Sequence, residues 1–113
     1  MDIEKVRIYC LSKQGAEETM PFGPDALVMK VNGKVFAILP LASERVRINL
    51  KCDPNYAIEL RDENTDIIPG FHMNKKHWNT LLLDGNLREA FVKKLIDHSY
   101  DLIFSKNSKK AKT

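Results

Sequence analysis

Residues 26–41, "ALVMKVNGKVFAILPL", carry the pattern that decides the fold. In this stretch Asn32-Gly33 separates two runs of residues that favour β-strands. Both central positions of a type I′ turn require a positive φ, which asparagine and glycine adopt at the lowest steric cost. The stretch therefore predicts a hairpin of two antiparallel strands.

The next stretch, "RVRINLK" at residues 45–51, alternates strictly between polar and apolar side chains. Val46, Ile48 and Leu50 would point toward a core. The other face, toward water or a partner, would carry the side chains of Arg45, Arg47, Asn49 and Lys51. The alternation predicts a third antiparallel strand with a basic outer face.

Helices are predicted before and after these three strands in the sequence. Apolar residues at helical spacing predict a first helix over about 2–12. Asp53 as N-cap and Pro54 at the first helical position predict a second helix, which would end at about Asp62. The residues between the first helix and the hairpin would form a loop with a short strand near Glu18–Met20.

The segment after the second helix is predicted as a loop over residues 64–76. Pro69-Gly70 would form the middle of a type II turn in this loop, with the glycine at a positive φ. "HWNTLLL", residues 77–83, then predicts a last strand.

A third helix is predicted over about 87–104, with Asn86 as its N-cap and Glu89 as the capping-box partner. Residues 105–113, "SKNSKKAKT", are lysine-rich and polar, so we expect a disordered tail. Together the elements predict an α+β fold, a two-layer sandwich of an antiparallel sheet with helices on one face. Residues 1–104 would form this single domain.

Length and composition agree with one domain, because 113 residues with 43% hydrophobic side chains can bury one core. No apolar run approaches the roughly 20 residues of a membrane helix. Charged residues near the N-terminus argue against a secretory signal. Cys10 and Cys52 stand far apart and fit buried free thiols, so we expect a cytoplasmic protein without membrane contact.

The net charge of +3 belongs to the tail, which holds four lysines and no acid. Residues 1–104 therefore carry 14 basic and 15 acidic side chains. Any affinity for nucleic acid must come from a local patch or from the tail.

Catalytic and metal sites find little support in the sequence. His72 and His77 are five positions apart, which suits a shared metal on neither a strand nor a helix. Residues 97–99, "DHS", are adjacent on a predicted helix and cannot form a relay. Phosphate-binding loops such as GxGxxG are absent. We expect no metal, no cofactor and no enzymatic activity.

Residues 73–79, "MNKKHWN", are the best candidate for contact with nucleic acid. Lysines can neutralise phosphates, asparagine can bond base edges or sugars, and tryptophan can stack. A solvated turn followed by a tryptophan anchored in the core is the alternative interpretation. With the basic strand face, the candidate residues are Arg45, Arg47, Lys51, Asn74, Lys75, Lys76, His77 and Asn79.

The sequence resembles the MmcQ/YjbR family of small bacterial proteins. The resemblance covers about residues 5–104 and runs through "GAEETMPFGPDALVMKVNGKVFAIL", "IIPGFHMNKKHWNTLLLDG" and "LIDHSYDLI". It implies a CyaY-like α/β fold and DNA binding through a double wing of strands and loops. No catalytic residue or cofactor comes with it.

Three functions remain open. The leading hypothesis is a non-catalytic DNA-binding accessory protein that contacts phosphates through the basic loop and strand face. The alternative is a module that binds a protein or peptide on an open sheet face or edge. The third is an enzyme that uses the His72–His77 loop as a pocket wall.

Overall fold

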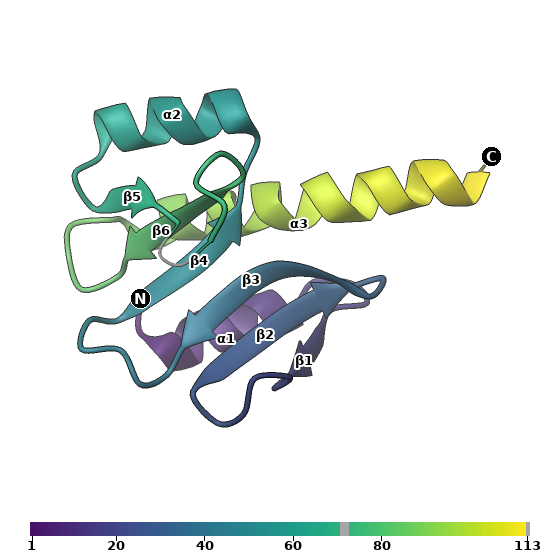
Figure 1. Ribbon diagram of the computed structural model, residues 1–113, viewed down its shortest axis with the longest axis horizontal. Helices are drawn as coiled ribbons and strands as arrows, with labels where there is room; N and C mark the ends of the chain where they lie inside the picture. Colours follow the sequence, from purple (N-terminus) through teal and green to yellow (C-terminus); the bar gives the residue numbers. More distant parts are fainter. Residues whose placement is uncertain (71–72, 113) are drawn as a thin grey trace.

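The computed structural model describes residues 1–70 and 73–112, which form one sheet and three helices (Figure 1). The helices are α1 (Ile3–Leu11), α2 (Pro54–Glu63) and α3 (Glu89–Lys112). The strands are β1 (Glu17–Thr19), β2 (Ala26–Val31), β3 (Lys34–Pro40), β4 (Arg47–Lys51), β5 (Ile67–Pro69) and β6 (Trp78–Leu82). The predicted α+β class is confirmed.

The sheet is antiparallel throughout, with the strand order β1-β2-β3-β4-β6-β5. Asn32 and Gly33 join β2 to β3 with φ values of 52° and 79°, which confirms the predicted hairpin turn. β6 lies between β4 and β5, so residues on both sides of α2 come together in the sheet.

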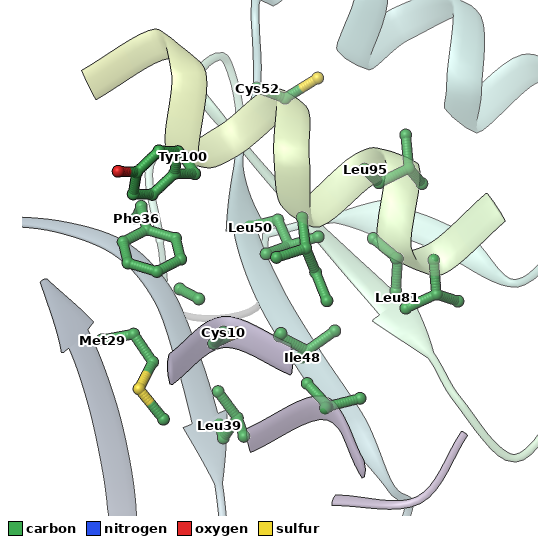
Figure 2. Close-up of a cluster of buried hydrophobic side chains, with 14 of the residues drawn as sticks. Cys10, Met29, Phe36, Leu39, Ile48, Leu50, Cys52, Leu81, Leu95 and Tyr100 are labelled. Atoms are coloured by element: carbon green, nitrogen blue, oxygen red, sulfur yellow. The ribbon is translucent and has the colours of Figure 1, made fainter. Parts of the chain in front are cut away.

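The helices cover one face of the sheet. Figure 1 shows α1 and α3 behind the strands and α2 beside β5 and β6. Ile48 and Leu50 of β4 point into this layer, where they are at most 2% exposed. Figure 2 shows them with Leu81 of β6 and Leu95 of α3 in the same apolar cluster. The predicted inward direction is confirmed for Ile48 and Leu50, whereas it is wrong for Val46, which precedes β4 and is 37% exposed.

Phe36 of β3 fixes α3 against the sheet. The register between β2 and β3 shifts after Met29, and Phe36 is the extra residue at this bulge. Its ring is fully buried and meets Tyr100 edge-on at 5.5 Å between centroids (Figure 2). Ser99 also donates a hydrogen bond of 2.5 Å from Oγ to the Phe36 carbonyl oxygen. The bulge therefore contacts the last helix through both the ring and the carbonyl of Phe36.

The segment predicted as a loop over residues 64–76 contains the short strand β5. Ile67 pairs with Leu81 and Ile68 with Thr80, so the two isoleucines extend the sheet. Gly70 is not at a positive φ, and the predicted type II turn is wrong. Glycine is needed there for space, because a Cβ would lie 2.7 Å from the Cβ of Trp78.

The third helix differs from its predicted bounds at both ends. It begins at Glu89, and residues 87–88 lie outside the helix. The backbone N–H of Asn86, the predicted N-cap, donates instead to the Asp66 carboxylate at 2.7 Å. The helix backbone continues to Lys112, through most of the tail that was predicted to be disordered. Residues 105–112 contain neither proline nor glycine to stop a helix. Within the described residues, no helix has the length and apolar character required to cross a bilayer.

Candidate functional site

The cations predicted to form one patch lie at opposite ends of β4. Arg45 precedes the strand and Lys51 ends it. At about 3.3 Å per residue, β4 alone keeps Arg47 and Lys51 about 13 Å apart. The basic strand face is therefore divided into an Arg45 end and a Lys51 end.

At the Arg45 end, the guanidinium is bound to a carboxylate. Arg45 donates from Nε to Asp84 Oδ2 at 3.0 Å and from Nη2 to Oδ1 at 2.5 Å. This hydrogen-bonded pair raises the pKa of Arg45 and lowers the pKa of Asp84. Arg45 and Arg47 line a broad hollow of about 410 Å³ together with Glu44. The charge of Arg45 is compensated by Asp84 in this structure, so the structure does not favour Arg45 for the predicted phosphate contact.

At the Lys51 end, five segments surround a depression of about 160 Å³. The segments are the start of β3, the end of β4, the start of α2, the turn before β6 and one side of α3. The lining residues are Lys34, Lys51, Cys52, Asp53, Pro54, His77, Leu102 and Ile103. Cationic side chains and apolar side chains thus share one hollow.

The turn at residues 74–77 lies next to this depression and is held in place by hydrogen bonds. Asn74 Oδ1 accepts from the backbone N–H of Lys76 at 2.9 Å and of His77 at 3.2 Å. The His77 carbonyl accepts from the Cys52 N–H at 2.8 Å. Asn74 therefore shapes the turn, while the side chains of Lys75 and Lys76 are exposed.

Arg61 of α2 joins this turn to the rest of the domain. Its Nη1 donates to the Lys75 carbonyl and to Asn79 Oδ1, both at 2.9 Å. Arg61 lies in the last turn of α2, where basic residues are common because they favour the negative end of the helix dipole. Its presence there therefore did not indicate this role. Arg61 is thus a positioning residue that the sequence did not reveal.

Asn79 does not contact bases, contrary to the prediction. It pairs with Leu50 across the sheet, faces the helices and is 1% exposed. Its Nδ2 donates to the Ala57 carbonyl at 3.3 Å, and its Oδ1 accepts from Arg61. Trp78, on the opposite face of β6, is half-buried and does not belong to the main core. Asn79 and Leu81 therefore point to the helices, whereas the tryptophan that the alternative interpretation placed in the core lies on the other face.

Lysines around the depression carry uncompensated charge. We call Lys34, Lys51, Lys75, Lys76 and His77 the lysine surface. None of its four lysines forms an ion pair with any residue that the structure describes. Asp53 also lines the depression, and its Oδ2 accepts from the Tyr56 N–H at 3.1 Å as N-cap of α2. The surface is therefore cationic on balance.

Cys52 and His98, beside the depression, are structural groups. Burial raises the pKa of the Cys52 thiol to about 11, so it is protonated at pH 7. His98 Nε2 accepts from the backbone N–H of Asp53 at 3.2 Å, and its ring meets Tyr56 edge-on. Burial lowers the pKa of His98, with Asp53 and Asp101 acting in the opposite direction. A neutral imidazole is required here, because a protonated one cannot accept this hydrogen bond.

The "DHS" residues of α3 contact three different elements. Asp97 accepts from Tyr9 and Lys13 of the N-terminal part, each at 2.7 Å. His98 binds the start of α2, and Ser99 binds β3. This geometry confirms that they form no relay. Among the described residues, no three histidine, cysteine or acidic side chains gather in a way that could hold a metal ion. His72 lies outside the described residues.

The open sheet face and the edges offer little to a partner strand. The edge strands β1 and β5 are three residues long, and β5 ends in a proline. In the middle of the open face, Thr80 donates to Asn49 Oδ1 at 2.6 Å, and both side chains are buried. Short edges with proline are a common protection against strand addition.

Comparisons with known proteins agree on one family. A family model described as YjbR matches residues 11–102. The protein YjbR of Escherichia coli K12, described as uncharacterised, is 36% identical over 100 residues, which cover 88% of this chain and 85% of YjbR. YbdF of Escherichia coli O157:H7, also described as uncharacterised, is 37% identical over 83 residues, or 74% of this chain and 68% of YbdF.

Solved structures show the same fold. The DR2400 protein of Deinococcus radiodurans, with a DUF419 domain, superposes with a TM-score of 0.86 at 33% identity, covering 94% of this chain and 80% of DR2400. A crystal structure of a Pseudomonas syringae protein gives a TM-score of 0.80 at 29% identity, covering 90% of this chain and 98% of that protein.

Proposed function

We propose that this chain, a member of the YjbR family, binds DNA without catalysis through the lysine surface at the Lys51 end of β4. The observation that carries the proposal is the set of four lysines with no ion pair among the described residues. Arg7, Lys13 and Arg45 are bound to carboxylates. Lys30, Arg88 and Lys94 also have no ion pair among the described residues, but none of them lines the depression.

Charge distribution supports this assignment. Residues 1–104 have nearly equal numbers of acids and bases, so a local excess of positive charge at one site is not a consequence of composition. When unpaired lysines neutralise phosphates, counterions condensed on the DNA are released, which makes binding favourable at low salt. Four further lysines follow Ile103 in the sequence, at positions 106, 109, 110 and 112.

A fixed backbone supports it further. Hydrogen bonds with Arg61, Asn74 and the Cys52 N–H hold the 74–77 turn. The side chains of Lys75 and Lys76 therefore extend from a backbone of defined position. A preorganised surface loses less entropy on binding than a loose loop does. Neither Cys52, with its raised pKa, nor the dispersed "DHS" residues supply a nucleophile, and we propose that the chain acts by binding alone.

Fluorescence anisotropy of a labelled DNA oligonucleotide tests the proposal. The variant Lys51→Gln/Lys75→Gln/Lys76→Gln removes three charges, and we expect weaker binding and a shallower salt dependence. The slope of log Kobs against log salt should fall by about 0.7 to 0.9 for each lysine that contacts a phosphate.

Arg45→Gln is the matched control, since it removes a cation at the other end of the same strand. It should bind DNA as the unmodified chain does. Equal affinity and equal slope for the triple variant and the unmodified chain would overturn the proposal.

A further inference from the structure

The depression at the Lys51 end has a feature that binding to a phosphate backbone does not require. Four of its lining residues are apolar or neutral: Cys52, Pro54, Leu102 and Ile103. Exposed lysines are sufficient to contact phosphates on the outside of a duplex, without an apolar wall. An apolar wall beside cations suits a ligand with both a flat apolar part and an anionic part.

We propose that this depression takes one unpaired nucleotide, with the base against the apolar wall and a phosphate on Lys34 and Lys51. The inference rests on the proposed function and deepens it, because it makes single-stranded DNA the preferred ligand. Bases of any sequence can lie on an apolar surface while cations follow the backbone, which is how proteins bind single strands without reading sequence.

The size of the depression agrees with one base. Its volume of about 160 Å³ exceeds the roughly 10–15 Å³ that one water needs. It is smaller than the roughly 300–1,000 Å³ of pockets that enclose drug-sized ligands. The depression therefore has room for more than a single water and less than a drug-sized ligand, a range that suits one base.

The polar backbone of the rim has its own partners. The Cys52 N–H donates to His77, and the Asp53 N–H donates to His98. The Asp53 carboxylate accepts from Tyr56. Because these groups are engaged, the rim reads few base edges, and we infer a preference for strandedness over sequence. A base stacked within a duplex would have to unpair and unstack before entering, which disfavours the duplex.

Three labelled probes with equal numbers of phosphates test the inference on the unmodified chain: a single strand, an abasic strand of the same length, and a duplex. We expect the single strand to bind about tenfold more tightly than the abasic strand, as one stacked base contributes. The duplex should bind like the abasic strand, through charge alone.

Leu102→Asn, which makes the apolar wall polar without changing charge, should remove most of the single-strand advantage. Ile58→Asn is the matched control, since Ile58 is 52% exposed on α2 and does not line the depression. Circular dichroism establishes folding of both variants, and the comparison of the three probes decides the matter even if Leu102→Asn is unfolded.

If the single and abasic strands bind alike, the unpaired-nucleotide site is refuted, while salt-dependent binding of both leaves the DNA-binding proposal standing. If no probe binds in a salt-dependent way, both proposals fail together.

Discussion

At one end of β4, Arg45 is bound to Asp84 through two nitrogens, whereas at the other end Lys51 has no ion pair with any described residue. Both were equivalent in the sequence, as basic residues on the polar side of one alternating strand. The difference comes from residues distant in sequence: Asp84 follows β6, and the 74–77 turn precedes it. A cation is available to a ligand only when no such carboxylate reaches it.

The largest effect should come from a substitution that displaces the backbone near the Lys51 end. In Gly70→Ala the new Cβ would lie 2.7 Å from Trp78 Cβ and 3.0 Å from the Trp78 carbonyl oxygen. The backbone must shift, and we expect the free energy of unfolding to fall by about 1–3 kcal/mol. Chemical denaturation measures it. Glu44→Ala, at an exposed site near the Arg45 end, should change stability by less than about 0.5 kcal/mol. A Gly70→Ala variant as stable as this control would show that the close approach at Gly70 is not tight.

A smaller effect should follow from releasing the turn while keeping all of its lysines. Arg61→Met removes the donor to the Lys75 carbonyl and to Asn79. We expect a loss of stability of about 1 kcal/mol. DNA binding should also weaken, because the backbone that carries Lys75 and Lys76 is no longer held in one position. Binding equal to that of the unmodified chain, at equal stability, would mean that Arg61 does not position the turn.

Acid should act on the Lys51 end through His98. The pKa of His98 is lowered from its ordinary 6.5 by burial, so the folded state binds this proton less readily than the unfolded state does. The stability contributed by neutral His98 is therefore present above pH 6.5 and is lost as pH falls below that value. Thermal unfolding at pH 7 and pH 5 measures it. His98→Gln, which keeps an acceptor but cannot titrate, should lose less stability between these pH values than the unmodified chain. An equal loss in both would contradict the assignment.

The smallest effect concerns the Arg45 end. Arg45→Ala should raise the pKa of Asp84 toward its ordinary 3.8, since the hydrogen bond from Arg45 is the largest cause of the lowering. The stability that this lowered pKa supplies is present above pH 3.8 and is lost as pH falls through the lower, folded value. NMR titration of the Asp84 carboxyl group measures the shift. An unchanged pKa in the variant would show that the pair does not persist in solution.

The sequence predicted most of the fold because its strongest signals are local. The Asn32-Gly33 turn, the alternation of residues 45–51 and the Asp53-Pro54 helix start each depend on a few neighbouring residues. β5 was missed because three residues carry no period of their own. Gly70 was misread because the reason for a glycine there, the side chain of Trp78, lies on another strand.

The candidate site was predicted only in part, for the same physical reason. The exposure of Lys75 and Lys76 follows from a polar turn, which the sequence shows. The burial of Asn79 depends on β6 placing it opposite Leu50 and on Arg61 reaching it from α2. Lys34 was not among the predicted residues at all, because the hairpin turn reaches the depression only in three dimensions.

The measurement that tests the central claim most directly is an NMR titration of the isotope-labelled chain with a DNA oligonucleotide, followed residue by residue. We predict that amide shifts will concentrate at Lys34, at residues 51–54 and at residues 74–77, while residues 42–47 and Asp84 stay unchanged. Shifts that gather around Arg45 and Asp84, or no shifts at saturating DNA and low salt, would contradict the assignment of binding to the Lys51 end of β4.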